Sequence, residues 1–565
     1  MESMEHFSSV RDRIRIRIEK RIESLQNGYR QNIGLVGLPG IGKTHFLCSM
    51  FKTLTGRSHL VPFFLQAEKL SFDCFLESWI GALLSGLFLS QNITVPKNFS
   101  SLLQAAEFIV PKTTEKIRNL KKLVRQERNV AAVKELFSLA RILAEETKKN
   151  VILMIDEFQA LGKLPIPDPF ALLGKEMMVD THTLYFVTSS QPQRAKEIFH
   201  DKLSLLFGNF EVIDMVPFSF SETVEVLTSR LPGFLFSPLQ KKFMIRMTDG
   251  HPAYLDLLID QLSSPTPPEE SWEVPTDYLL AAFIRELSSR KGRIALMFEK
   301  RLEACSRFAK DGSPYIQALL AISHGRHKVL AIATFLERKI TETKNILQRL
   351  VQEDMVAKRG SFYVLEDPLF RFWLKHAYEV RNHCYTPDQE AICTGLKRSL
   401  REEFEQIERQ ERMDITARVE GLLKEFRNDV VEVDEKKFQC PYFSEIVFRP
   451  TNGRIFPLLA RSGKTRWFCQ IAPAPVVEED VTAFLEELQR LRKKVQRKIM
   501  ITLKGIDQNA KLMAQEAKIQ LWNLRNFNAL LDLYDLPKII TTDESQERGH
   551  DATDLGALAQ SIHQT

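Results

Sequence analysis

Short apolar runs alternate with longer amphipathic stretches in the N-terminal part of the chain. Residues 33–36, 60–65, 151–155 and 184–188 have the length and the apolar composition of buried strands. Stretches with helical periodicity lie between them, and a charged amphipathic pattern at residues 8–26 predicts a helix that leads into the first strand. Strands separated by helices favour an α/β fold with a parallel sheet.

The pattern changes further along the chain. A Ser- and Pro-rich stretch at residues 263–270 predicts a linker. Three short helical patterns then precede a pair of strand-like runs that meet at the turn Lys358-Arg359-Gly360-Ser361. The helical patterns cover residues 315–322, 329–336 and 341–351, and the two runs fall within 354–365. Residues 431–540 mix short strands with helices, and the polar residues 541–565 are expected to be disordered.

Composition excludes several classes of protein. The 565 residues are 44% hydrophobic, with 24 Gly and 25 Pro, which excludes fibrous and low-complexity chains. The 7 Cys include no Cys-x-x-Cys pair, so neither a disulfide framework nor a thiolate zinc site is expected. We find no signal-peptide pattern and no apolar run that approaches the roughly 20 residues of a membrane helix. A cytoplasmic protein without a membrane partner is therefore predicted.

Charge leaves the choice of partner open. Lys and Arg number 78 against 72 Asp and Glu, a net charge of +6 that is compatible with nucleic acid without indicating it. The helical stretch 112–128 is strongly basic. It is either a solvated helix face or a surface for nucleic acid or a protein partner.

The clearest motif lies directly after the first predicted strand. Its sequence matches a phosphate-binding loop, and a helical stretch follows it. In such a loop, backbone N–H groups and the helix N-terminus hold the phosphates of ATP, Lys43 reaches the β- and γ-phosphates, and the Thr44 hydroxyl binds Mg²⁺. The candidate nucleotide-binding residues of the loop are Gly37, Leu38, Pro39, Gly40, Ile41, Gly42, Lys43 and Thr44.

Two carboxylates follow the apolar run 151–155. A buried strand brings Asp156 to its exposed carboxyl end, where it can hold Mg²⁺ through water. Glu157 can orient and deprotonate the attacking water, so Glu157, Lys43 and Asp156 are the candidate catalytic residues. The run 184–188 ends in polar residues, of which Thr188 and Ser190 are candidates to contact the γ-phosphate or the water.

These motifs, with Val216-Pro217-Phe218-Ser219 before a helix and Gly250-His251-Pro252-Ala253-Tyr254-Leu255, resemble the archaeal-type ATPases. That group belongs to the STAND branch of the AAA+-related P-loop proteins, near the origin-recognition ATPases. The resemblance implies that Gly250 and Pro252 lie in a small helical lid and contact the base or sugar of the nucleotide. The family often carries a Gly-Arg pair where this chain has Gly208-Asn209, so the arginine finger is unidentified, with Arg194 and Arg230 as candidates.

The three helical patterns and the strand pair resemble the winged helix that follows the ATPase in this family. The segment Asp367-Pro368-Leu369-Phe370-Arg371-Phe372-Trp373 is similar to the signature that closes that module. In DNA-binding winged helices the third helix enters the major groove and the wing contacts the backbone. The candidate DNA-binding residues are Lys344, Asn345 and Arg349 on the third helix and Lys358 and Arg359 on the wing. A protein-interaction module is the alternative.

Residues 431–540 resemble the restriction-endonuclease-like domain that some archaeal-type ATPases carry. Active members hold Mg²⁺ with an Asp on one strand and a Glu-x-Lys on the next. Here the corresponding stretches are Phe456-Pro457-Leu458 and Cys469-Gln470-Ile471-Ala472, which lack the carboxylates and the lysine. The resemblance therefore implies an inactive domain that has kept only a binding role.

The sequence predicts an ATP-binding and ATP-hydrolysing switch that couples nucleotide state to DNA binding through a winged helix. The alternative is a STAND-type regulatory scaffold that controls protein assembly without DNA contact. The expected domains are a P-loop ATPase core (1–215), a helical lid and linker (216–310), a winged helix (311–380), a helical connector (381–430), an inactive nuclease-like domain (431–540) and a disordered tail (541–565).

Overall fold

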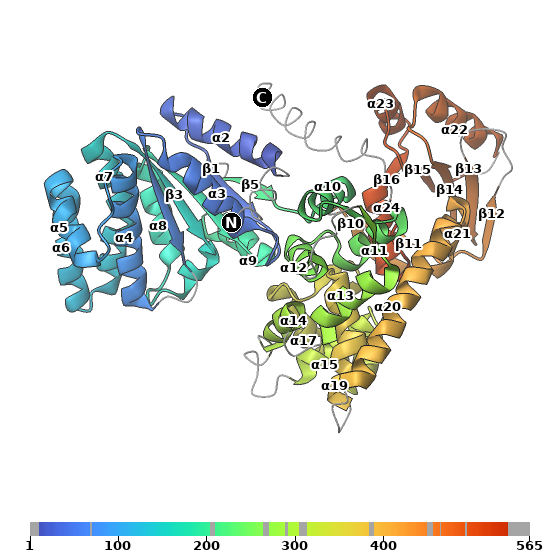
Figure 1. The fold of residues 1–565 in the computed structure, drawn as a ribbon. Coiled ribbons are helices and arrows are strands. Elements are labelled where there is room, and N and C mark those ends of the chain that lie inside the picture. Colours follow the sequence, from blue (N-terminus) through green and yellow to red (C-terminus); the bar gives the residue numbers. More distant parts are fainter. Residues whose placement is uncertain are drawn as a thin grey trace. The chain divides into compact units, whose positions relative to one another are not determined.

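The computed structural model groups the chain into two compact units (Figure 1). One comprises Met1–Pro217 with His251–Ala253 and Gln352–Asp354, and the other holds the remainder. The structure describes residues 11–67, 71–203, 210–263, 271–288, 292–303, 305, 313–383, 389–434, 436–448, 456–463, 465–491 and 494–540. Gly208-Asn209, most of the predicted linker and the predicted disordered tail lie outside the described residues.

A five-stranded parallel sheet forms the centre of the first unit. Its strands follow the order β2-β3-β4-β1-β5, and every neighbouring pair is parallel. The four strands predicted from the apolar runs are confirmed, and a fifth strand completes the sheet. The strands are β1 (Asn32–Val36), β2 (Leu60–Gln66), β3 (Asn150–Asp156), β4 (Thr183–Ser189) and β5 (Phe210–Asp214).

Helices cover both faces of this sheet (Figure 1). Successive side chains of a strand point to opposite faces, so β3 sends Ile152 and Met154 toward one core and Leu153 and Ile155 toward the other. The first core includes α2 (Asp12–Gln26) and α3 (Lys43–Thr55), and the second includes α4 (Phe72–Ser90), α7 (Asn129–Thr147) and α8 (Pro169–Val179). Apolar residues on both faces account for the nearly continuous apolar runs of the strands.

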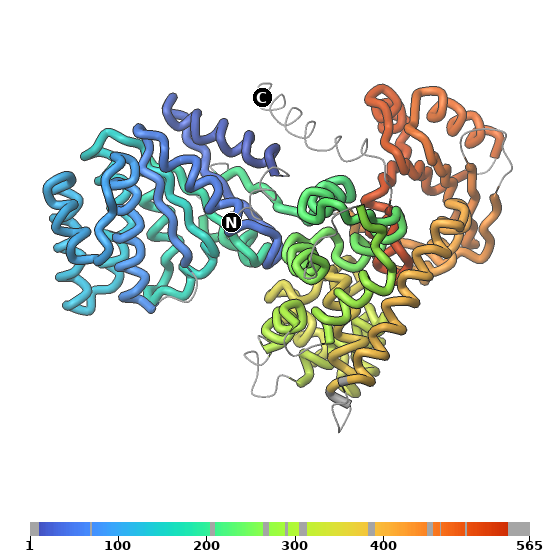
Figure 2. The backbone as a smooth tube through the Cα atoms, in the orientation of Figure 1, coloured from blue at the N-terminus to red at the C-terminus, as the bar shows by residue number. Residues whose placement is uncertain are grey.

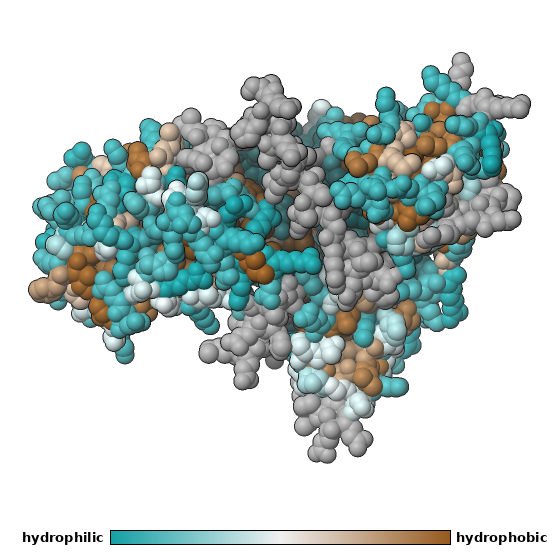
Figure 3. All heavy atoms as spheres, turned by 90° about the horizontal axis from the view of Figure 1, so that it is seen from above, coloured by the Kyte–Doolittle hydropathy of each residue, from teal (hydrophilic) through white to brown (hydrophobic). Residues whose placement is uncertain are grey.

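Helix α4 corrects the expectation that no apolar run approaches the length of a membrane helix. With 19 residues it is long and apolar enough to cross a membrane by length and composition, and half of its apolar window is buried. No other helix of the described residues meets that test. Trp79, Leu83 and Leu87 pack into the unit's core, which accounts for its apolar character. On the face drawn in Figure 3, hydrophilic residues predominate and apolar residues form separate groups.

The basic stretch 112–128 forms most of helix α6 (Pro111–Arg125), which packs between α5 (Phe99–Ile109) and α7. Several of its charges are engaged within the unit. Lys116 pairs with Glu135 at 3.1 Å, Arg118 pairs with Glu107, and the Lys121 ammonium lies 4.6 Å from the centre of the Phe99 ring. Both interpretations of the stretch remain predictions.

The second unit begins with a helical layer. Helix α20 (Gln389–Glu411) runs along α11 and α13 and closes one side of the layer (Figure 2). The layer consists of α10 (Phe220–Arg230), α11 (Pro238–Thr248), α12 (Pro252–Ser263), α13 (Thr276–Ser288) and α14 (Arg293–Glu303), with short strands β6 (Phe234–Leu235) and β7 (Trp272–Glu273).

Three helices and a hairpin follow in the predicted order. They are α15 (Ser313–Ser323), α16 (Val329–Leu336), α17 (Ile340–Gln352), β8 (Ala357–Arg359) and β9 (Phe362–Val364). The two strands are antiparallel, and Lys328, just before α16, bridges to Phe362 as an additional strand position. Asp367 then caps helix α18 (Pro368–Trp373) by accepting a hydrogen bond from the Phe370 N–H at 2.9 Å.

The C-terminal part holds a second five-stranded sheet, in the order β12-β13-β14-β15-β16. The first three strands are antiparallel and the last two continue in parallel, with helices in the crossovers. The elements are α21 (Ile415–Glu425), β10 (Asp429–Val433), β11 (Lys436–Cys440), β12 (Glu445–Phe448), β13 (Phe456–Ser462), β14 (Thr465–Ala472), α22 (Glu478–Arg490), β15 (Arg497–Thr502), α23 (Gln508–Glu516), β16 (Gln520–Asn523) and α24 (Leu524–Leu533).

Candidate nucleotide-binding site

The loop between β1 and α3 has the backbone of an anion-binding turn. Gly40 and Gly42 adopt φ angles of 78° and 97°, in the left-handed region that favours glycine. Gly42 is the residue before α3, so the unpaired N–H groups of the first helical turn face the loop. Such a helix start attracts phosphate through its N–H groups and its dipole.

Lys43 is folded onto the loop itself. Its side chain is buried, and the Nζ donates to the carbonyl oxygens of Gly37 and Leu38, at 2.8 Å each. Burial lowers the pKa of Lys43 to about 8, and the nearby carboxylates of Glu157 and Asp156 counteract part of this effect. The ammonium is therefore held where an incoming phosphate would compete with two backbone carbonyls.

The predicted magnesium ligands lie together. The Thr44 hydroxyl donates to Asp156 Oδ2 at 2.7 Å, although the two residues are 112 positions apart. Asp156 Oδ1 accepts from the Thr188 hydroxyl, which also accepts the Glu157 N–H at 3.3 Å. A hydroxyl and a carboxylate at one point are the hard oxygen ligands that Mg²⁺ prefers, so these residues fit the metal.

Thr188 has a defined place in this arrangement. It is fully buried and both of its hydrogen bonds hold the end of β3, so in this structure it orients Asp156. That its hydroxyl contacts the γ-phosphate stays a prediction.

Glu157 has a strained backbone and a fully engaged carboxylate oxygen. Its φ is 54°, an uncommon value for a non-glycine residue, and such strain is concentrated at functional sites. Its Oε2 accepts from the Ser190 hydroxyl at 2.6 Å, from the Ser190 N–H at 3.2 Å and from Gln159 Nε2. The carboxylate thus lies beside Asp156 at the carboxyl edge of the sheet, with Ser190 and Gln159 as its partners.

His251 lies over the loop. Its Nε2 donates to the Pro39 carbonyl at 2.9 Å, and a Cβ on Gly40 would lie 2.7 Å from its ring. The neighbouring Gly250 adopts a φ of 69°, and a Cβ there would lie 2.0 Å from the Phe218 carbonyl, so only glycine fits. Pro252 is the first residue of α12, a position that proline favours.

Two contacts of the candidate site were missed in the sequence. Gln159 could have been suspected because it follows Glu157 by two residues, in the short 3-10 helix after β3. His251 was visible only as the middle residue of a Gly-x-Pro motif, and nothing local indicated its contact with Pro39. The arginine-finger candidates have partners of their own, since Arg194 pairs with Glu197 at 2.8 Å and Arg230 with Asp256 at 3.0 Å.

Helices α15, α16 and α17, the hairpin of β8 and β9, and the closing helix α18 together form the hairpin module. Its third helix, α17, presents the predicted DNA-binding residues outward. Thr343, Leu347 and Leu350 are buried on one side of α17. Lys344 and Arg349 are exposed on the other side, as is Asn345. The helix is therefore amphipathic, with its polar face at the surface.

The tip of the hairpin packs against strand β10. The Ser361 N–H and hydroxyl both donate to the Val430 carbonyl at 2.8 Å, and a Cβ on Gly360 would lie 2.3 Å from the same oxygen. Lys358 lies 5.8 Å from the centre of the Tyr363 ring, and Arg359 pairs with Glu366. Both cations are exposed, but the turn that follows them is bonded to Val430.

The C-terminal sheet carries no acidic cluster in the described part of the chain. No group of three or more His, Cys, Asp or Glu that could hold a metal occurs among the described residues. Gln470, at the position where the resemblance places a glutamate, is buried and its Oε1 has no hydrogen-bond partner.

The sequence matches no protein-family model and no curated protein. Among solved structures, the chain is similar to a Walker-type ATPase of Pyrococcus abyssi, with 17% identity, 63% of this chain and 93% of that chain covered, and a TM-score of 0.43. It is similar to the ORC2 protein of Aeropyrum pernix in ADPNP–ADP complexes, with 12% identity, coverage of 70% and 94%, and a TM-score of 0.42. It is also similar to the RuvB Holliday junction branch migration motor of Thermotoga maritima, with 13% identity, coverage of 64% and 94%, and a TM-score of 0.32.

Proposed function

We propose that this chain is an ATP-binding and ATP-hydrolysing switch. The observation that carries the proposal is the hydrogen bond from Thr44 to Asp156, which joins the start of the helix after the glycine loop to the end of a buried strand. A helix-start hydroxyl and a strand-end carboxylate at one point provide a magnesium site beside a phosphate-binding turn. Glu157 follows directly, where a general base is needed.

Each residue then has a distinct role. Lys43 exchanges the carbonyls of Gly37 and Leu38 for the β- and γ-phosphates. Thr44 and Asp156 hold Mg²⁺, which when bound neutralises charge that develops on the phosphates. Glu157 accepts the proton of the attacking water, and Ser190 and Gln159 hold its carboxylate by hydrogen bonds. Ser190 and Thr188 are the candidate γ-phosphate contacts.

On the strength of the resemblance, we assign Gly250 and Pro252 to contacts with the base or sugar of the nucleotide. The rigid turn at Gly250 and the proline at the helix start support close approach of backbone to a ligand.

DNA is the proposed partner, through helix α17. Lys344, Asn345 and Arg349 share its exposed face, and such side chains read base edges when a helix lies in the major groove. Lys358 and Arg359 would add contacts to phosphates, which carry no sequence information.

One observation favours the alternative, a regulatory scaffold without DNA contact. The hairpin tip is bonded to Val430, so the wing already takes part in a protein contact. A salt titration separates the two functions, because phosphate contacts make DNA affinity fall steeply with salt. Absence of affinity for any duplex or single strand at about 50 mM salt, with ATP present, would favour the scaffold.

The C-terminal sheet is proposed to bind rather than cleave. With Mg²⁺ or Mn²⁺ and linear, nicked or single-stranded DNA, we expect no cleavage above a Lys43→Ala control. Metal-dependent cleavage that is lost when residues 431–540 are deleted would contradict this assignment.

The ATPase assignment is tested by Glu157→Gln. Because an amide cannot accept the water proton, turnover should fall by about 10²- to 10⁴-fold while ATP binding is kept. Glu145→Gln, an exposed carboxylate that pairs with Arg141 in the same unit, is the matched control and should leave turnover unchanged. A Glu157→Gln protein that hydrolyses ATP at the parent rate would refute the assignment of the base.

A further inference from the structure

The segment that lies over the phosphate-binding loop is anchored on both sides. His251–Ala253 group with the first unit, where His251 bonds to the loop at Pro39. The residues that precede and follow this segment group with the second unit. Any shift of the loop that moves His251 must therefore pull on Gly250 and Tyr254 through the covalent chain.

The anchor on the C-terminal side is buried. The Tyr254 hydroxyl donates to Asp367 Oδ2 at 2.6 Å, and its ring packs edge-on against Phe298 with centroids 5.5 Å apart. Arg301 donates to the same Asp367 oxygen at 3.1 Å. Because Asp367 is also the cap of α18, Tyr254 is bonded to the start of the helix that closes the hairpin module.

The anchor on the N-terminal side is an ion pair with the last described segment of the chain. Asp249 ends α11 in the left-handed conformation, with a φ of 50°, and its Oδ1 lies 3.2 Å from Lys538 Nζ. The side chains are half-buried. The acidic neighbours Asp249 and Asp532 raise the pKa of Lys538, although burial acts against them.

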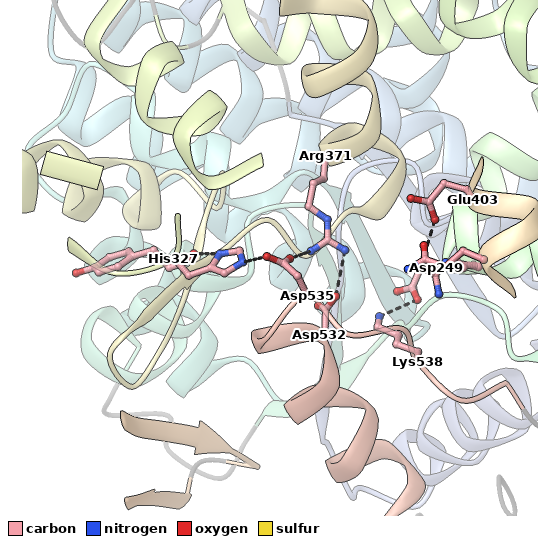
Figure 4. Close-up of polar contacts among 10 residues, drawn as sticks. Asp249, His327, Arg371, Glu403, Asp532, Asp535 and Lys538 are labelled. Carbon is pink, nitrogen blue, oxygen red and sulfur yellow. Dashed lines mark hydrogen bonds and ion pairs between the residues drawn. The ribbon is translucent and has the colours of Figure 1, made fainter. Parts of the chain in front are cut away.

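Figure 4 shows Arg371 of α18 directed toward Asp532 and Asp535, and Lys538 of the same segment directed toward Asp249. Arg371, on α18, pairs with Asp532 at 3.2 Å and with Asp535 at 3.3 Å, at the end of α24 and just beyond it. Asp535 also accepts from His327 Nε2 at 2.8 Å, two residues before α16. These contacts link Asp249 to Lys538 and the segment 532–538 to Arg371. Arg371 lies on the helix that Asp367 caps, and Asp367 is bonded to Tyr254. We call this set of linked side chains the circuit.

The composition of the circuit indicates what it does. Within it, Lys538 and Arg371 are matched by Asp249, Asp532 and Asp535, and His327 provides a further donor, so the carboxylates already have partners and no external ion is required. These ion pairs connect segments that are far apart in the sequence, since Arg371 and Asp532 are 161 positions apart and Asp249 and Lys538 are 289 apart. Its members come from the helical layer, from the hairpin module and from the C-terminal domain.

We propose that this circuit couples the nucleotide site to the hairpin module and the C-terminal domain. Tyr254 and Asp249 act as positioning residues. Nucleotide that shifts the loop displaces His251. The hydrogen bond of Tyr254 then transmits the displacement to α18, and the ion pair of Asp249 transmits it to the segment 532–538. The proposal rests on the proposed nucleotide binding and goes beyond it by naming the contacts that regulate it.

Hydrogen–deuterium exchange of the full chain tests the coupling. We expect saturating Mg-ATP or Mg-ADP to change the exchange of peptides that cover Pro368–Trp373 and 532–538 by at least threefold relative to nucleotide-free protein. The double variant Tyr254→Phe/Lys538→Met removes one hydroxyl and one charge and should abolish both changes, while nucleotide affinity stays within threefold of the parent. Tyr254→Phe alone retains the packed ring and serves if the double variant does not fold.

The matched control removes the same groups elsewhere in the second unit. Tyr278→Phe/Lys437→Met deletes a hydroxyl that donates to the Leu262 carbonyl at 2.8 Å and an exposed lysine that pairs with Glu432, and should respond like the parent. A parent that binds nucleotide without changed exchange at either peptide, or a Tyr254→Phe/Lys538→Met variant that keeps the parent response, overturns the proposal. Failure of the parent to bind nucleotide more tightly than Lys43→Ala would instead refute the proposed function.

Discussion

The affinity for nucleotide should fall as the pH rises above 8, because Lys43 is buried. Burial lowers the pKa of this ammonium to about 8, so it is charged in about nine-tenths of nucleotide-free molecules at pH 7 and in about one-tenth at pH 9. Only the charged form can contact the phosphates, and bound phosphate keeps it charged. The dissociation constant should therefore be about tenfold larger at pH 9 than at pH 7, which corresponds to about 1.4 kcal/mol.

Titration calorimetry with Mg-ADP measures this effect in two ways. The dissociation constant gives the slope with pH, and experiments in buffers of different ionisation enthalpy give the protons taken up, which should approach one per site at pH 9. Lys43→Ala should bind weakly, without this slope. An affinity in the parent that stays within twofold between pH 7 and pH 9 would show that the lysine is not titrating, and would refute the reasoning.

Lys43 should affect the stability of the nucleotide-free protein in the opposite direction, so that stability increases as the pH rises. Because the folded-state pKa lies below the ordinary value of 10.5, the unfolded chain holds the proton to higher pH. Between about pH 8 and pH 10.5 the contribution of Lys43 to the stability of the nucleotide-free protein should therefore rise with pH.

Two further predictions concern packing and DNA. Gly86→Ala should lower the free energy of unfolding by about 1–3 kcal/mol in denaturant, because its Cβ would lie 1.9 Å from a carbonyl oxygen of β2. Gly81→Ala in the same helix meets nothing within 4 Å and should be neutral or stabilising. Equal effects of the two substitutions would contradict the packing. Replacing Lys344 and Arg349 by alanine should weaken DNA binding and relax any sequence preference, with each lost phosphate contact reducing the slope of log affinity against log salt by about one. Unchanged affinity and slope would remove α17 from the interface.

The strands and the loop could be predicted because their signals are local. Each buried strand is a short apolar run, and the glycine loop, Lys43 and Thr44 are contiguous in the sequence. Asp156 was recognisable because it follows such a run, and the parallel sheet then brings it to Thr44. Amphipathic periodicity likewise located α17 and the hairpin.

Contacts between distant segments could not be predicted. Tyr254 and Asp367 are 113 positions apart, Asp249 and Lys538 are 289 apart, and neither pair leaves a periodic pattern. The contact of Ser361 with Val430 spans 69 positions and depends on how the hairpin packs on the domain that follows. Helix α4 was missed as a long apolar helix because the charged residues Asp73 and Glu77 interrupt its apolar run in the sequence.

Equilibrium binding of ATP, with and without Mg²⁺, tests the central claim most directly. The parent should bind ATP, and Mg²⁺ should tighten binding. Thr44→Val, which removes only the hydroxyl bonded to Asp156, should lose most of the gain from Mg²⁺, and Lys43→Ala should lose most of the affinity. Parent, Thr44→Val and Lys43→Ala proteins that bind ATP equally, or a parent that does not bind it, would contradict a nucleotide site at this loop.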